Sequence, residues 1–171
     1  HALGDWLAGS PTRAAAQIQV VLSLHPRDAL AMKMIQAIHF VMGRPDAMRT
    51  SVEEVMPAWD DHPARGYLLG CHAFALEETG EYARAERTGR KGVDLAPDDA
   101  WGLHAVAHVH DMTGRARDGL DWLSGREASW SHCNNFRFHV WWHRALMHLD
   151  LGEYDIALAH YDADIRAEKT D

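Results

Sequence analysis

The chain has 171 residues, of which 47% are hydrophobic and 25% are charged; this composition is typical of a folded globular protein and excludes a disordered or collagen-like chain. The formal net charge of −8 argues against a surface that attracts nucleic acid or anionic lipid. Protonation of all 13 histidines would make the net charge positive, so histidine is the unusual component of the composition.

The cysteine content bears on the cellular compartment of the protein, and the first residues bear on whether the chain is part of a longer protein. Two cysteines, Cys71 and Cys133, are too few for a disulfide framework, so we expect reduced thiols and a cytoplasmic protein. No apolar run is long enough to span a bilayer. The first residues, HALGDWLAGS, lack Met and the basic and apolar regions of a signal peptide. We therefore expect a piece of a longer protein or a processed product.

Glycine and proline recur with a nearly constant period of roughly 34 to 38 residues. The positions that mark this period are Gly9, Gly43, Gly80, Gly114, Gly152, Pro26, Pro63 and Pro97. Glycine is typical of the residue that follows a helix, and proline ends a helix because it lacks the N–H group. We interpret each unit as a helix hairpin, since no long stretch alternates apolar and polar residues as a strand would.

In chain order, residues 10–26 predict the second helix of a partial first repeat, whose first helix is mostly absent. Residues 28–63 match the repeat weakly. Residues 64–97 match it best: LLGCHAFALEETG ends at Gly80, and EYARAERTGRKGVDLAP ends at Pro97. Acidic residues follow the prolines, as in Arg27-Asp28 and Asp98-Asp99, and we expect them to cap the next helix.

The C-terminal half contains two further units, residues 98–124 and 135–166. Between them the segment 124–135, SGREASWSHCNN, is rich in Ser, Gly and Asn and is predicted to be a loop. Asn134 or Asn135 is the expected N-cap of the helix that follows. The whole chain, 1–171, is thus predicted to be one all-α domain: a right-handed α-α superhelix of about four hairpins plus a leading helix.

A 34-residue helix–turn–helix unit with small residues at fixed places resembles the tetratricopeptide repeat. The residues that carry this resemblance most clearly are Ala73, Gly80, Tyr82, Ala85 and Pro97. The strings GCHAFALEETGEYARAE, DDAWGLHAVAHVHDMTGR and HVWWHRALMHLDLGEYDIALAHYD resemble the tetratricopeptide repeat protein 38 family. This resemblance implies an all-helical repeat protein without an established catalytic activity, in a family whose members are longer than this chain.

In such a solenoid the first helix of each hairpin lines a concave groove, and helical spacing selects its outward positions. The predicted groove residues are Tyr67, Phe74, Glu77, Trp101, His104, His108, Asp111, His139 and Trp142. Aromatic residues are typical anchors of protein interfaces. We therefore expect a scaffold that binds a peptide or protein segment. The acidic chain favours a basic or neutral segment, and neither nucleic acid nor membrane is an expected partner.

Two histidine pairs, His104/His108 and His139/His143, each have i, i+4 spacing, which places both imidazoles on one helix face. The plainer interpretation is that they cap, hydrogen-bond or pack in a polar groove, with no cofactor. The alternative is a site for zinc, another divalent metal or a small molecule, with an enzymatic role left open. Neither pair contains the Glu of an H-E-x-x-H motif. A metal site requires ring nitrogens of the two pairs within about 5 Å.

Three further expectations concern single features. Cys133 lies beside His132 and Asn134, but sequence neighbours rarely form a catalytic site, and we assign no catalytic residue. If the groove histidines are solvated, the groove gains positive charge as the pH falls through about 6.5. The last hairpin, 153–171, carries apolar side chains that a neighbouring repeat would normally cover. It predicts either a missing flanking segment or a homodimer through open solenoid ends.

Overall fold

Short helices that pair as hairpins make up the computed structural model, which describes residues 1–166. The first four helices are α1 (Ala2–Leu7), α2 (Pro11–Leu24), α3 (Ala29–Val41) and α4 (Pro45–Val55), and a 3₁₀ turn (Met56–Trp59) follows. The middle of the chain forms α5 (Arg65–Glu78), α6 (Tyr82–Leu95), α7 (Ala100–Met112) and α8 (Ala116–Leu123). The rest forms α9 (Ala128–Ser131), α10 (Asn135–Asp150), α11 (Tyr154–His160) and a π-helical turn (Tyr161–Ile165).

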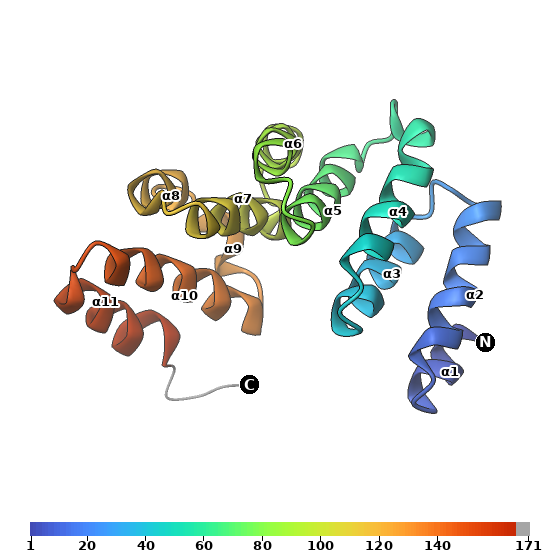
Figure 1. Ribbon diagram of the computed structural model, residues 1–171, viewed down its shortest axis with the longest axis horizontal. Helices are drawn as coiled ribbons and strands as arrows, with labels where there is room; N and C mark the ends of the chain where they lie inside the picture. The colour runs from blue at the N-terminus through green and yellow to red at the C-terminus, as the bar shows by residue number, and fades with distance from the viewer. Residues whose placement is uncertain (167–171) are drawn as a thin grey trace.

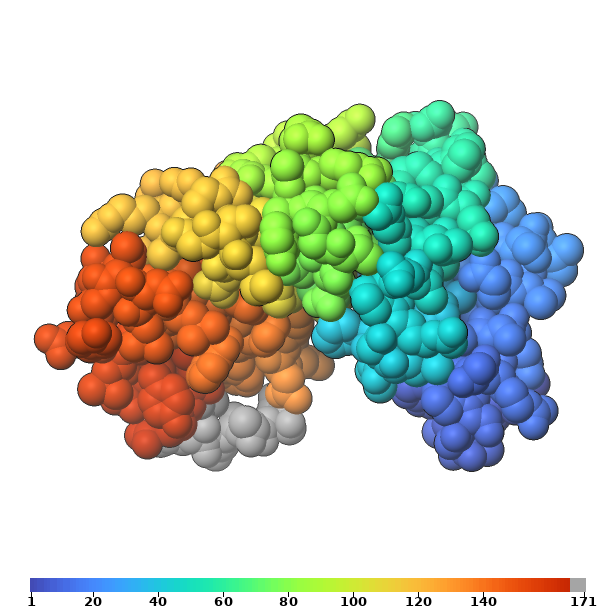
Figure 2. Space-filling view, viewed as in Figure 1, coloured from blue at the N-terminus to red at the C-terminus, as the bar shows by residue number. Residues whose placement is uncertain are grey.

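The hairpins stack side by side into an arch (Figure 1). Helices α10 and α11 lie at one end, α1 to α4 lie at the other, and the α5–α6 hairpin stands between them. The first helices of successive hairpins contact one another, α3 with α5, α5 with α7 and α7 with α10. The space-filling view shows that the arch is hollowed between its two ends (Figure 2). The inner face of this solenoid is therefore built from α3, α5, α7 and α10.

The turn at Gly80 shows how the repeat marks end a helix. Gly80 has a φ of 79°, a conformation that side-chain-bearing residues rarely adopt. Its N–H donates to the carbonyl of Glu77, and the N–H of Glu81 donates to that of Leu76. This pairing satisfies carbonyls that the helix end leaves free. The other four glycine marks also have positive φ, as the predicted role requires.

Two aspartates begin helices in the predicted way. The Asp28 carboxylate accepts from the N–H of Ala31, and the Asp99 carboxylate accepts from that of Gly102. Asn134 occupies the cap position of α10, but its side chain makes no capping hydrogen bond. Side-chain capping therefore fixes the start of α3 and α7, which carry part of the inner face.

Glycines let α5 and α7 approach closely. A Cβ atom on Gly70 would collide with the Asp99 carboxylate and lie 2.9 Å from the Cα of Gly102. A Cβ atom on Gly66 would lie 2.6 Å from that of Ala96, where α6 ends. Small residues set the spacing between α5 and α7 at the first point, and between the two helices of the α5–α6 hairpin at the second.

The structure adds detail at two places. The predicted leading helix is α2, and the six-residue helix α1 packs against it as its hairpin partner. The segment 124–135, expected to be a loop, contains the helical turn α9, whose Trp130 is fully buried and packs edge-on against Trp141. A large apolar side chain therefore anchors this connection.

None of the helices in residues 1–166 is long and apolar enough to cross a membrane. Within the described part of the last hairpin, large apolar side chains on α11 are exposed. These side chains are Tyr154, Ile156 and Leu158, and Tyr161 is exposed at the start of the π-helical turn that follows. The predicted hairpin extends to residue 171, and its positions from 167 onward lie outside the described residues.

Candidate functional site

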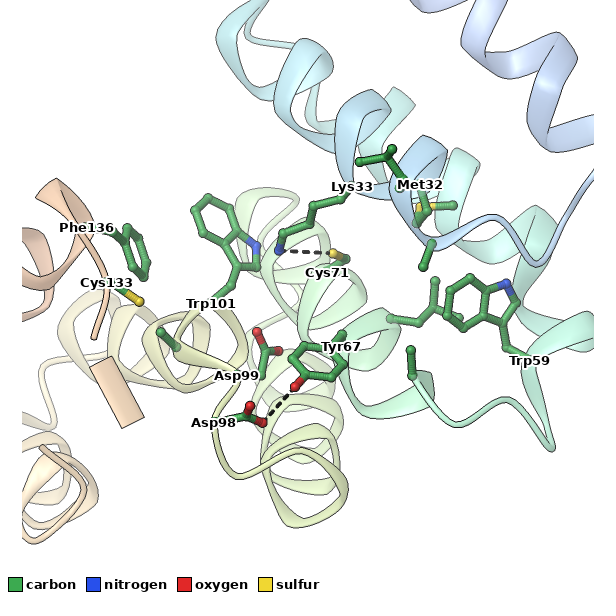
Figure 3. A pocket seen from close by; sticks show the side chains of 15 residues that line it. Met32, Lys33, Trp59, Tyr67, Cys71, Asp98, Asp99, Trp101, Cys133 and Phe136 are labelled. Carbon is green, nitrogen blue, oxygen red and sulfur yellow. Dashed lines mark hydrogen bonds between the residues drawn. The ribbon is translucent and has the colours of Figure 1, made fainter. Parts of the chain in front are cut away.

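A pocket of about 550 Å³ opens where the first helices begin. Figure 3 shows Trp101 standing between Phe136 on one side and Lys33 on the other. Four successive hairpins contribute, so a single ligand in this pocket would contact all of them. The side chains that line it include Leu30, Met32, Lys33, Tyr67, Leu68, Cys71, Trp101, Cys133 and Phe136.

The walls are apolar, but charged groups lie at two edges. The Lys33 ammonium lies 4.9 Å from the centre of the Trp101 ring and 3.7 Å from the Cys71 sulfur. Within residues 1–166, it has no carboxylate oxygen within 4.0 Å. On the other side Asp98 accepts a hydrogen bond of 2.7 Å from the Tyr67 hydroxyl (Figure 3). The ammonium of Lys33 can thus donate to a ligand oxygen.

Asp99 forms the second acidic group of the pocket. Burial raises the pKa of Asp99 to about 6, although Lys33 and the backbone N–H groups at the start of α7 oppose this rise. Near neutral pH the Asp99 carboxylate is ionised, although its burial disfavours the charged form. It serves as the cap of α7, and it also lies against Gly70 of α5.

The predicted groove residues fall into exposed and covered groups. Tyr67, His139 and Trp142 are exposed, and Trp101, His108 and Asp111 are partly exposed. Phe74, Glu77 and His104 are buried. The structure brings most of them into one continuous group on α5, α7 and α10. Trp142 is separate, because it lines a smaller pocket between α10 and α11 with Leu149 and Tyr154.

Phe74 lies beneath this surface instead of on it. Its ring packs edge-on against Trp101 at 4.7 Å and against Phe40 at 5.4 Å, and it is only 1% exposed. It therefore supports the aromatic wall of the pocket and does not contact solvent. The inner face is more closely packed at this point than helical spacing alone predicts, because neighbouring first helices touch.

The two histidine pairs meet at the contact between α7 and α10. One ring nitrogen from each histidine lies within 4.8 Å of the others. Between the pairs, the ring centres of His108 and His143 are 4.3 Å apart, and those of His104 and His139 are 4.7 Å apart. The separation required for a shared metal site is therefore met. Phe136 and Trp101 pack against His104, so this cluster adjoins the pocket.

Carboxylates flank this histidine cluster. Asp111 lies 2.8 Å from Nδ1 of His143, and Glu77 lies 3.6 Å from Nδ1 of His108. The Glu78 carboxylate also approaches His108, since one oxygen of each glutamate and one nitrogen of that ring lie within 4.8 Å of one another. Acidic side chains therefore flank the imidazoles, two from α5 and one from the end of α7.

Two histidines of this cluster do not titrate as solvated groups do. Burial, followed by repulsion from the three neighbouring histidines, lowers the pKa of His104 well below its usual value. Burial and the nearby His143 and His108 lower the pKa of His139 to about 4. The gain of positive charge near pH 6.5 was expected only for solvated rings, and the lowered pKa values of His104 and His139 mean that these two residues do not supply it. At neutral pH both rings are uncharged.

Cys133 has a histidine at 3.7 Å, the adjacent His132. Burial, with a further contribution from Asp99, raises the pKa of the Cys133 thiol. A raised pKa disfavours the thiolate that a nucleophilic cysteine needs. Burial likewise raises the pKa of Cys71. Both cysteines are free thiols that line the pocket as small apolar groups.

Spacing along the first helices did not identify several pocket residues. Phe136, Cys133, Asp98 and Asp99 lie at or before the first turn of a helix, where a pattern of outward positions does not yet apply. Of these four residues, the two aspartates had a sequence signal of another kind, because they were expected to cap α7. A cap marks where a helix begins, and the pocket surrounds the beginnings of α3, α5, α7 and α10.

No protein-family model matches the chain. Among solved structures, a thermophilic tetratricopeptide repeat protein of Thermus thermophilus superposes with a TM-score of 0.70 and 15% identity, covering 96% of this chain and 86% of that one. Pseudomonas aeruginosa PilF superposes with a TM-score of 0.69 and 17% identity, covering 98% of this chain and 74% of that one. MamA of Desulfovibrio magneticus superposes with a TM-score of 0.67 and 15% identity, covering 94% of this chain and 87% of that one. These likenesses confirm the predicted fold, an α-α solenoid of the tetratricopeptide repeat type.

Proposed function

We propose that this chain is a scaffold that binds an extended peptide segment of a partner protein across the inner ends of α3, α5, α7 and α10. The observation that carries this proposal is the apolar pocket lined by all four of these helices. Pockets of 300–1,000 Å³ with apolar walls and a few polar groups are typical ligand sites. A side chain of the partner would enter beside Trp101, an aromatic residue of the kind that anchors interfaces.

The polar groups at the edges of the pocket indicate which segment fits. Lys33 can donate to a carbonyl of the bound segment, and Asp98 and Asp99 repel acidic side chains. The formal net charge of −8 also disfavours an acidic segment. We therefore propose a neutral or basic segment with one large apolar residue. The same charge makes nucleic acid and anionic lipid poor partners.

We infer further that the chain is related to the tetratricopeptide repeat protein 38 family, on the sequence strings quoted above. Two free thiols fit a reducing, cytoplasmic compartment. The exposed apolar side chains of α11 favour contact with a second copy of the chain at the open end.

Peptide binding is tested by selecting from a phage-displayed random library on purified chain and measuring the affinity of the selected peptides by fluorescence anisotropy. Leu30→Asp places a charge at the pocket edge, on a side chain that is 71% exposed, so the fold should tolerate it. We expect a dissociation constant at least tenfold higher, because an apolar contact is replaced by a desolvated carboxylate.

The matched control is Leu24→Asp on α2, a side chain that is 70% exposed and does not line the pocket. It should leave the dissociation constant unchanged. If no peptide is enriched, or if both variants weaken binding equally, the pocket is not a peptide site.

A further inference from the structure

We propose that one divalent transition-metal ion binds between α7 and α10, with four imidazoles as its ligands: His104, His108, His139 and His143. This proposal does not depend on peptide binding, because it uses other side chains and a separate measurement. It assigns a role to the histidine cluster beyond packing.

The distances between the ring nitrogens are close to those of a bound ion. Zinc–nitrogen bonds of about 2.0–2.1 Å in a tetrahedron place the four nitrogens roughly 3.3 Å apart. In the structure Nε2 of His143 and Nε2 of His139 are 3.2 Å apart. The whole set of four lies within 4.8 Å. Small side-chain rotations would bring the more distant nitrogens to bonding distance.

The cluster contains buried nitrogens that have no partner within residues 1–166. Both ring nitrogens of His104 and Nε2 of His108 are buried and make no hydrogen bond. His104 itself is only 2% exposed. An unsatisfied buried polar group costs about 1–3 kcal/mol. A metal ion would accept lone pairs from both rings and so remove part of this cost.

The orientation of His143 shows which of its nitrogens faces the other rings of the cluster. Its Nδ1 lies 2.8 Å from an oxygen of Asp111, which accepts the N–H hydrogen bond there. The proton on Nδ1 leaves Nε2 with its lone pair directed at the other rings. Metal-binding histidines usually donate their second N–H group to a carboxylate or carbonyl in this way.

The charges around the cluster favour a cation. Glu77 is only 5% exposed, and one of its oxygens is buried without a hydrogen bond. Together with Asp111 it places two carboxyl groups beside the four imidazoles. A divalent cation at the centre would be attracted by both of them.

The donor set indicates the class of ion. Imidazole suits zinc, copper, nickel and iron, whereas magnesium and calcium prefer oxygen ligands. Four protein ligands are typical of zinc sites that stabilise structure. His139 is exposed and leaves a path from solvent to the cluster. The ion would thus tie α7 to α10, the first helices of two successive hairpins.

The test uses the chain with any affinity tag removed and with metal stripped by a chelator. Zinc is titrated in competition with a chromophoric chelator, and cobalt is added separately to detect the visible absorption of tetrahedral Co²⁺. We expect one zinc ion per chain, a rise in melting temperature on binding, and no response to magnesium. A chain that binds no stoichiometric zinc at micromolar concentration would overturn the proposal.

The variant His139→Ala removes one ligand at an exposed position, so the fold should remain intact by circular dichroism. We expect zinc binding at least 100-fold weaker and loss of the tetrahedral cobalt spectrum. The control His25→Ala removes an exposed histidine after α2 and should bind as the parent does. If His139→Ala binds zinc as tightly as the parent, or if His25→Ala is the variant that loses it, the proposed ligand set is wrong.

Discussion

Asp111 and His143 join the end of α7 to the middle of α10 through a contact of 2.8 Å between a carboxylate oxygen and Nδ1. This contact orients the imidazole so that its other nitrogen lies 3.2 Å from Nε2 of His139. In the metal site that we propose, Asp111 is therefore a positioning residue that touches a ligand and not the ion.

Asp111→Asn tests that positioning role. The amide still accepts a hydrogen bond but carries no charge, so we expect zinc affinity to fall about 10- to 100-fold, as for other changes outside the ligand set. Competition titration with a chromophoric chelator measures the effect. Asp118→Asn, on the exposed face of α8, is the control and should retain the parental affinity. Equal zinc affinities for the parent and both variants would show that Asp111 does not position a metal ligand.

Gly70→Ala tests the close approach of α5 and α7. The new methyl group would collide with the Asp99 carboxylate and the Gly102 backbone, so we expect the free energy of unfolding to fall by about 1–3 kcal/mol. Urea denaturation measures this loss. Gly4→Ala in α1 is the matched control, since its added Cβ meets no atom within 4 Å and alanine favours the helix. Destabilisation by Gly4→Ala alone would contradict the packing described here.

Asp99→Asn tests the buried carboxylate at the start of α7. The pKa of Asp99 is about 6 in the folded chain, above its ordinary value of about 3.9. The folded state therefore binds this proton more tightly, and the parent loses stability as the pH rises from about 4 through 6. Asparagine also caps helices and does not titrate.

Relative to Asp99→Asn, we thus expect the parent to lose about 1 kcal/mol of unfolding free energy between pH 5 and pH 7.5. Urea denaturation of both proteins in the presence of a chelator gives this difference and cancels the titration of groups distant from Asp99. A difference that stays constant with pH would show that Asp99 has an ordinary pKa in the folded chain. A difference that grows in favour of the parent as the pH rises would show that the pKa is lowered. Either result would contradict a raised pKa.

Leu158→Glu tests whether the open end of the solenoid joins two copies. The side chain lies exposed on α11, and a charge there should disfavour an apolar contact between chains. We expect the parent to dimerise with rising concentration in sedimentation equilibrium and the variant to stay monomeric. Leu95→Glu, exposed on α6, should behave as the parent. A parent that is monomeric at all concentrations would exclude this contact.

The fold was predictable because its signals are local. Gly80 needs only its own backbone conformation to end α5, and Asp99 needs only the first turn of α7 to act as a cap. Trp130 shows the limit of such signals. Ser, Gly and Asn around it indicated a loop, but its burial against Trp141 belongs to tertiary packing that no local pattern encodes.

The candidate site was predictable in part for the same reason. Spacing of four residues placed His104 with His108 and His139 with His143, and the contact of α7 with α10 brought the pairs together. The burial of Phe74 and the low pKa of His104 depend on how closely neighbouring helices approach. Glycines such as Gly70 determine this approach, and its extent appears only in three dimensions.

The most direct measurement for the central claim, a metal site on the inner face of the solenoid, is anomalous diffraction at the zinc absorption edge from crystals of the zinc-loaded chain. We predict one strong peak between α7 and α10, about 2.0–2.1 Å from a nitrogen of each of His104, His108, His139 and His143. Peaks only at other sites, such as the partly buried His148–Glu153 or His160–Asp164 pairs, or no peak at all, would contradict it.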